Sequence, residues 1–174
     1  TFYVPKDENV CPYLSAFTAL AFNWLRHEGY PVPKQVEARL HENLLSMLRR
    51  DEAAPHYSRS MSATVRAVAL AALSEGGKIG RTELDRFWNQ VPEMSLFGKA
   101  LYLQALLQVP ETRARQRELI ERILSHADRG SGTLVFRESL DSGFEALLSS
   151  SIRDNAAVLS ALTAFETSYP SDPI

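Results

Sequence analysis

Residues 61–77 read MSATVRAVALAALSEGG, and this stretch decides the fold. From Met61 to Leu73 almost every residue is apolar or small, and the run stops at Gly76 and Gly77. Glycine commonly ends a helix because it adopts the left-handed backbone conformation at little cost. A helix that is apolar on most of its circumference has to be covered by protein on nearly every side. The stretch therefore predicts a buried, inner helix.

Three further segments have the same character, at residues 13–28, 96–109 and 152–165. Each inner segment carries an adjacent alanine and leucine, and the small alanine side chains let neighbouring helices approach closely. The leucines and one phenylalanine of these segments are the predicted core. They are Phe17, Leu20, Leu70, Leu73, Leu103, Leu106, Leu159 and Leu162.

The segments between the inner ones are amphipathic, each with one apolar stripe and a charged face. They span residues 33–50, 82–91 and 113–127. One-sided helices of this kind cover a core and face water, so we expect them on the outside. Thr82 with Asp85, and Ser151 with Asp154, resemble capping signals and predict where two of the helices begin.

Inner and outer helices thus alternate along the chain, which predicts an all-α fold. The intervals between the inner segments are too irregular for a tight solenoid, and a partial α/α toroid fits them better. Residues 133–140 alternate apolar and polar side chains and predict one short β-hairpin near residues 133–148. The last inner helix has no outer partner. We therefore expect residues 1–174 to be a single domain that forms a fragment of a larger ring.

The composition excludes several classes of protein. Of the 174 residues, 45% are hydrophobic and 23% are charged, which argues against a disordered, fibrous or membrane-embedded chain. A net charge of −2 gives no field that would attract nucleic acid. One cysteine cannot form an intrachain disulfide.

The chain starts at Thr1 and shows neither a secretion signal nor a lipid-attachment motif. Its most apolar stretch, residues 12–25, is interrupted by polar side chains and is shorter than the ~20 residues of a membrane-spanning helix. We expect any address or anchor to lie in a parent polypeptide outside these residues.

No metal or cofactor site is predicted. His41 begins a zinc-protease-like pattern, but Leu45 stands where that pattern requires its second histidine. The other histidines, His27, His56 and His126, lie on different segments. His27 and His126 fall in the last turns of predicted helices, where an imidazolium meets the negative end of the helix dipole.

Two alternatives from other functional classes stay open. Toroids of this kind also host glycan-active hydrolases and lyases, which need two carboxylates facing each other. The loop-borne candidates are Asp51, Glu52, Asp141 and Glu145, and no aromatic sugar platform accompanies them. A helical scaffold that binds partner proteins would also fit the alternation of helices.

Four strings of residues, taken in order, carry a resemblance to a known family. Residues 12–17 (PYLSAF) and 65–73 (VRAVALAAL) look like inner helices of one particular domain. Residues 95–101 (SLFGKAL) look like a third, and residues 149–156 (SSSIRDNA) look like the segment ahead of a fourth. That domain is the thioester domain of the bacterial alpha-2-macroglobulins, and the resemblance covers nearly the whole chain.

The resemblance implies part of a broad-range protease inhibitor, and not an enzyme. In the family, a protease cuts a bait region elsewhere in the parent protein, and the thioester domain swings out to acylate an amine of that protease. The implied partners are target proteases, other macroglobulin domains of the same chain and, in one class, a peptidoglycan synthase of the penicillin-binding type. The implied compartment is the periplasm, and many bacterial members attach to the inner membrane.

The reactive Cys-x-Glu-Gln motif of that family is absent from these residues, because Cys11 is followed by Pro12 and Tyr13. In the family the motif precedes the matched region, and some bacterial members lack it. In complement relatives a histidine ahead of an inner helix helps acyl transfer, and His56 lies in a comparable stretch, although a plain surface turn would explain it equally. We expect this chain alone to have no catalytic turnover, metal or cofactor.

Overall fold

The computed structural model describes residues 11–51, 56–130, 132–172 and 174. The chain is mostly helical, at 72%, which confirms the all-α class. Seven α-helices lie within the described ranges: α1 (Pro12–His27), α2 (Lys34–Arg50), α3 (Arg59–Glu75), α4 (Arg81–Phe87), α5 (Leu96–Leu107), α6 (Arg113–Leu124) and α7 (Ser151–Ser168).

Short elements connect these helices. Three are 3-10 helices and two are strands of an antiparallel hairpin: η2 (Trp88–Glu93), η3 (Pro110–Thr112), η4 (Ser142–Leu147), β1 (Ala127–Gly130) and β2 (Thr133–Phe136). The helix predicted over residues 82–91 therefore ends at Phe87 and continues as 3-10 turns. Pro92 lies inside those turns, where it cannot donate a backbone hydrogen bond.

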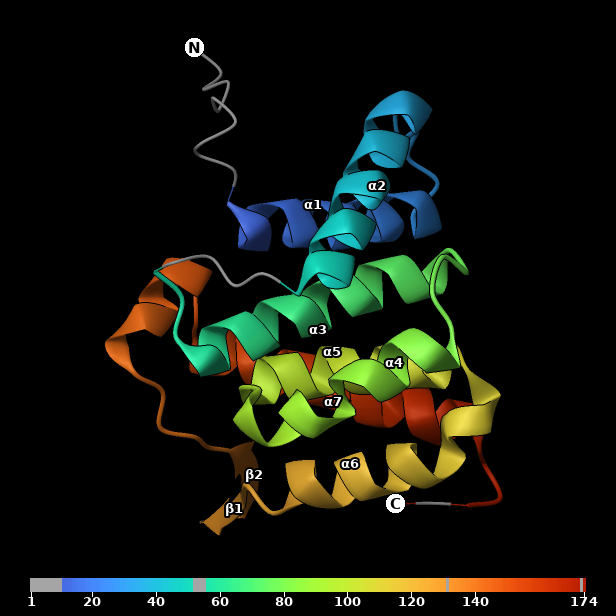
Figure 1. Cartoon of the computed structure of the whole chain (residues 1–174). Helices are drawn as coiled ribbons and strands as arrows, with labels where there is room; N and C mark the ends of the chain where they lie inside the picture. The colour runs from blue at the N-terminus through green and yellow to red at the C-terminus, as the bar shows by residue number, and fades with distance from the viewer. Residues whose placement is uncertain (1–10, 52–55, 131, 173) are drawn as a thin grey trace.

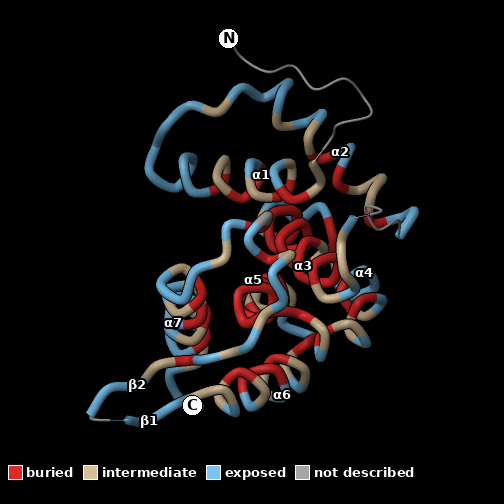
Figure 2. Tube along the Cα trace, turned by 90° about the vertical axis from the view of Figure 1, so that its left-hand side faces the viewer, coloured by how far each residue is buried: buried red, intermediate tan, exposed pale blue. Residues whose placement is uncertain are grey.

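The four odd-numbered helices form one row, because α1 packs on α3, α3 on α5 and α5 on α7. All four run in the same direction, from left to right in Figure 1. Helix α2 packs on α1 and α3, α4 packs on α5, and α6 packs on α5. Figure 2 looks nearly along the axes of α3, α5 and α7 and shows α2, α4 and α6 on one side of the row.

The core is densest in the middle of this row. From Met61 to Ser74 every residue of α3 except Arg66 is buried, and from Leu96 to Leu106 every residue of α5 except Gln104 is buried. The opening sequence stretch is therefore an inner helix, as its composition predicts. In contrast, α1 and α7 each bury one stripe and expose the opposite face (Figure 2).

Most of the predicted core residues are confirmed as buried or half-buried, and the prediction is wrong for one of them. Five of the predicted leucines are fully buried: Leu20, Leu70, Leu73, Leu103 and Leu106. Phe17 and Leu162 are half-buried against the core. Leu159, however, is 66% exposed. It lies on the face of α7 turned away from α5, and none of the described elements covers that face.

The predicted position of the hairpin near residues 133–148 is wrong. Strand β2 begins as predicted, but its partner β1 precedes it, with Ala127 opposite Phe136. Gly132 has a φ of 78°, which suits the tight connection between the strands. Residues 142–147 form η4 instead, because the Asp141 carboxylate accepts a hydrogen bond from the Gly143 N–H at 2.9 Å.

Both predicted capping signals are displaced by one or two residues. Helix α4 begins after Gly80, whose N–H donates to Glu83 Oε2 at 3.0 Å, and not at Thr82. Helix α7 is capped by Ser150, whose Oγ accepts from the Arg153 N–H at 3.2 Å, while Ser151 is already helical. The acidic residues assigned to these caps instead pair with arginine side chains.

None of the described helices is long and apolar enough to cross a membrane.

Candidate functional site

The helices α3, α5 and α7 begin at the same end of the molecule, on the left in Figure 1. A serine caps each of them: Ser58 accepts from Met61 N–H, Ser95 from Gly98 N–H, and Ser150 from Arg153 N–H. The segment after β2 crosses this end, and Ser58 Oγ donates to the Asp141 carboxylate at 3.4 Å. The row therefore presents three capped helix ends beneath one crossing segment.

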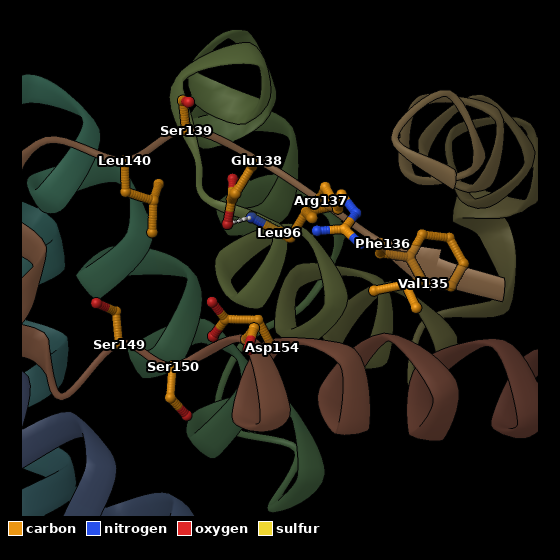
Figure 3. Close-up of a pocket in the computed structure, with 11 residues that line it drawn as sticks. Leu96, Val135, Phe136, Arg137, Glu138, Ser139, Leu140, Ser149, Ser150 and Asp154 are labelled. Atoms are coloured by element: carbon orange, nitrogen blue, oxygen red, sulfur yellow. Dashed lines mark hydrogen bonds between the residues drawn. The ribbon is translucent and has the colours of Figure 1, made fainter. Parts of the chain in front are cut away.

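A cavity of about 780 Å³ lies at this end, between the crossing segment and the start of α7 (Figure 3). Its walls combine apolar side chains with hydroxyl and carboxylate groups. They are Leu96, Val135, Phe136, Arg137, Glu138, Ser139, Leu140, Ser149, Ser150, Ser151 and Asp154. This volume falls within the ~300–1,000 Å³ of small-molecule sites.

Two carboxylates, Glu138 and Asp154, face each other across the cavity in Figure 3. Glu138 Oε1 accepts a hydrogen bond from the Leu96 N–H at 2.8 Å, at the first residue of α5. Burial raises the pKa of Glu138, and the negative charge of Asp154 acts in the same direction; the Leu96 N–H and Lys99 oppose them. A carboxyl group with a raised pKa can hold a proton closer to neutral pH than an exposed one.

Lys99 is only 5% exposed and lies close enough to Glu138 for their charges to interact. Its ammonium group donates to the Met94 carbonyl oxygen. Burial lowers the pKa of Lys99, and the charge of Glu138 partly compensates. A buried lysine of this kind needs the nearby carboxylate, so Glu138 and Lys99 stabilise each other's charged forms.

Asp154 is held by Arg153, which connects three elements at the edge of the cavity. The guanidinium donates to Asp154 Oδ1 at 2.7 Å, to the Tyr13 hydroxyl at 3.2 Å and to the Leu148 carbonyl at 2.9 Å. It also lies 4.0 Å from the centre of the Phe97 ring. The planar guanidinium suits this combination of several acceptors and an aromatic face. Arg153 thereby joins α1, α7 and the residue after η4.

The structure does not bring together the carboxylates that the glycan-active alternative names. Asp51 Oδ1 pairs with Arg66 at 2.8 Å, whereas Asp141 binds Ser58. Ser58 and Arg66 are eight residues apart, which is ~12 Å along a helix. Glu145 is exposed. Glu52 lies outside the described residues.

His56 is exposed and lies two residues before Ser58, at the N-terminal end of α3. Its ring meets the ring of Tyr57 edge to face, with the centres 4.7 Å apart. The Tyr57 hydroxyl lies 3.4 Å from Cys11 Sγ, so the half-buried thiol at the start of α1 contacts the start of α3. Burial, followed by the contact with Cys11, raises the pKa of Tyr57.

The other histidines have structural surroundings. His27 Nε2 lies 2.7 Å from Glu75 Oε1, and His126 Nδ1 lies 3.2 Å from the Arg137 carbonyl oxygen. His41 is buried, and burial lowers its pKa. In the part of the chain that the structure describes, no three histidine, cysteine or acidic side chains gather where they could hold a metal ion.

The sequence reasoning missed the cluster of Lys99, Glu138 and Arg153. Lys99 carries a signal that could have been used, because it is the only charged residue in the apolar helix α5. Glu138 carries no such signal, since it lies in an irregular segment between β2 and η4. The sequence suggests a capping role for Asp154 and no contact role for Arg153 beyond its place in the family-like string 149–156.

Comparison with models of protein families, with curated proteins and with solved structures finds no match to this chain.

Proposed function

We propose that this chain belongs to the thioester domain of a bacterial alpha-2-macroglobulin-like protease inhibitor. The observation that carries the proposal is the row of α1, α3, α5 and α7, with α2, α4 and α6 on one side of it. This order is the one that an α/α toroid requires, in which each hairpin contributes one inner and one outer helix. The four strings that resemble the family lie on the helices of the row or at their starts.

The two ends of the row support its continuation into a larger ring. The exposed large apolar side chains of α1 include Leu14, Trp24 and Leu25, and those of α7 are Ile152 and Leu159. Apolar faces of this kind on a globular chain usually mark surfaces that other protein covers. In the proposal, further helices of the same toroid cover them.

In this proposal the chain has no catalytic turnover, cofactor or metal of its own. The parent protein captures the target protease in the periplasm, and this chain forms part of the toroid of its thioester domain. Other macroglobulin domains of the parent are its neighbours, with inner-membrane anchoring and a peptidoglycan synthase as features that the resemblance adds. His56, at the N-terminal end of α3, is the candidate helper for acyl transfer.

The test uses the full-length parent protein and trypsin. A trapped protease still cleaves a small peptide substrate but no longer digests casein, because only the small substrate reaches its active site. With intact parent, we expect trypsin to keep its activity on the small peptide and to lose its activity on casein. With parent that a first protease has already cleaved, and after that protease has been inactivated, newly added trypsin should digest both substrates. If the parent binds proteins but trypsin still digests casein as well as the small peptide, the scaffold alternative is supported.

A pair of variants tests the ring itself. Leu159→Asp places a charge on the exposed face of α7, and Val36→Asp places one on an exposed position of α2. In the isolated chain both changes should shift the free energy of unfolding by no more than ~0.5 kcal/mol. In the parent, only Leu159→Asp should lower the unfolding temperature and the trapping activity. Equal behaviour of the two variants in the parent would count against a helix packed on α7.

Glycan cleavage is the second candidate function, and the cavity at α5 and α7 favours it. Glu138, with its raised pKa, and Asp154 share this cavity, as an acid and its partner carboxylate would. If the chain cleaves a glycan, Glu138→Gln should abolish the activity while the exposed control Glu145→Gln retains it. Equal activity of both variants would remove this candidate.

A further inference from the structure

Helix α2 is held on the molecule by few buried side chains, and one of them is a histidine. Of its 17 residues, only His41, Leu44 and Leu48 are buried. The helix packs chiefly on α1 and α3 (Figure 1). His41 is 8% exposed. A titratable ring therefore occupies one of the three buried positions of α2.

The ring of His41 lacks an acceptor for a second N–H. Its Nε2 atom is buried and has no hydrogen-bond partner among the described residues. A neutral imidazole needs only one N–H, which Nδ1 can carry, whereas an imidazolium carries an N–H at both nitrogens. Protonation of the docked ring would thus bury a charged N–H without a partner, which costs free energy.

The charges around His41 also oppose an imidazolium. In the described part of the chain, those that act on the ring are Glu37, one turn earlier on α2, Lys78 after α3, and Arg26 of α1. Glu37 alone would stabilise a positive ring, and its carboxylate already pairs with Arg26. Burial lowers the pKa of His41 below the ordinary value of 6.5, and the two positive groups act in the same direction while Glu37 opposes them.

Two ion pairs also tie α2 to its neighbours. Arg26 of α1 pairs with Glu37 near the start of α2, and Arg66 of α3 pairs with Asp51 at its end, at 2.8 Å. Ordinary carboxylates are ionised, and arginines are protonated, throughout the range from about pH 5.5 to 7.5. His41 is the histidine of α2 and therefore the group of this helix whose charge can change in that range.

We propose that His41 makes the docking of α2 sensitive to acid, so that α2 leaves α1 and α3 more often as the pH falls below neutrality. The released helix accepts the proton that the docked helix excludes, and protons therefore stabilise the released form. Release exposes Leu44 and Leu48 together with the apolar surface that covers them, and such a patch can bind another protein. This inference does not rest on the protease-inhibitor function or on the cavity at α5 and α7.

Protons act on this equilibrium only below the ordinary pKa of histidine. Above pH 6.5, the ring is mostly neutral in both forms. Below it, the released helix binds a proton that the docked helix does not bind. The equilibrium constant for release then rises by up to ~10-fold per pH unit, until the pH reaches the lowered pKa of the docked ring. From pH 7.5 to 5.5 we expect a rise of ~3- to 10-fold.

The test is native-state hydrogen exchange of the 174-residue chain at pH 7.5 and 5.5, with each rate divided by the intrinsic rate of that amide at the same pH. Protection of the amides of α2 should fall by ~3- to 10-fold at pH 5.5, and at both pH values it should stay below that of α3, because opening of α2 leaves the row folded. His41→Gln keeps a polar side chain that cannot be protonated there, so its α2 amides should show no such fall.

His27→Gln is the matched control, since His27 lies 2.7 Å from Glu75 and so joins α1 to α3 without contributing to α2. It should retain the fall that the wild type shows. The proposal is overturned if wild type and His41→Gln respond to pH equally, if His27→Gln abolishes the response, or if α2 and α3 are equally protected at pH 5.5.

A second measurement needs no variant and decides the question if His41→Gln itself fails to dock α2. The imidazole NMR signals of the wild-type chain report the midpoint at which His41 titrates. A midpoint below 6.5 that accompanies the faster exchange of α2 supports the proposal. A midpoint at or above 6.5 overturns it, because the docked helix would then not exclude the proton.

Discussion

At the scale of single residues, Arg153 holds more of the molecule together than any pattern in the sequence suggests. It binds Asp154, Tyr13 and the Leu148 carbonyl, and it covers Phe97. Arg153→Ala should therefore lower the free energy of unfolding by ~3–5 kcal/mol, because it leaves the buried Asp154 carboxylate without its partner.

The measurement is urea unfolding, with Arg39→Ala on the exposed face of α2 as the control, for which we expect a change within ~0.5 kcal/mol. Arg153→Lys should fall between the two, since lysine keeps the charge but loses the planar contacts with Phe97 and the carbonyls. If Arg153→Ala is no more destabilising than Arg39→Ala, the contacts of Arg153 contribute nothing to stability.

Glu138 makes the free energy of unfolding change with pH in the opposite direction to a carboxylate whose pKa is lowered by folding. Its pKa is raised above the ordinary value of 4.5, so the folded protein keeps a proton that the unfolded chain loses as the pH rises. The free energy of unfolding should thus fall as the pH rises from about 4.5 through the raised pKa. Glu138→Gln cannot ionise, so its stability relative to the wild type should increase over that interval.

Urea unfolding at a series of pH values measures this difference. Glu145→Gln, at an exposed position of η4, is the control and should follow the wild type across the same interval. A constant difference between Glu138→Gln and the wild type at every pH would contradict a raised pKa for Glu138.

At the scale of elements, Gly98 sets how closely α5 approaches α3. A Cβ atom at this position would lie 3.2 Å from the Cα atom and from Oγ1 of Thr64, and the same distance from the Met94 Cβ. Because one of these neighbours is backbone, the two helices would have to separate by a few tenths of an ångström. Gly98→Ala should therefore destabilise the chain by ~1–3 kcal/mol, despite the better helix propensity of alanine.

Gly80→Ala is the matched control, because a Cβ atom there meets nothing within 4 Å. Thermal unfolding of the two variants separates the effects of packing and propensity. If Gly98→Ala is at least as stable as the wild type, the helices α3 and α5 are not in close contact at this point.

The elements also show what the sequence can and cannot predict. Apolar runs with Ala-Leu pairs identify α3 and α5 as inner helices, because complete burial is the only environment that suits them. The predicted burial of Leu159 is wrong because periodicity reveals an apolar face but does not reveal whether another element covers it. Strand β1 is not predicted because Ala127–Gly130 shows no alternation of apolar and polar residues. Its pairing with β2 is set by the turn between the two strands. Glu138 was missed because its burial depends on tertiary packing.

At the scale of the whole molecule, burial decreases from the centre of the row toward its edges. Helices α3 and α5 are covered on nearly every side, whereas α2 buries only His41, Leu44 and Leu48 of its 17 residues. Figure 1 shows α2 extending beyond the row at its N-terminal end. Local opening of α2 would expose little apolar surface, but opening of α3 would expose the core that it forms with α1 and α5.

Native-state hydrogen exchange should therefore show that different helices open with different free energies. We expect the amides of α3 and α5 to exchange only through global unfolding, and those of α2 and the β1–β2 hairpin to exchange through local opening at a lower free energy. Low concentrations of urea separate the two routes, since exchange by global unfolding accelerates steeply with urea and exchange by local opening does not. Equal protection of α2 and α3, with the same dependence on urea, would mean that the row and its outer helices open as one cooperative unit.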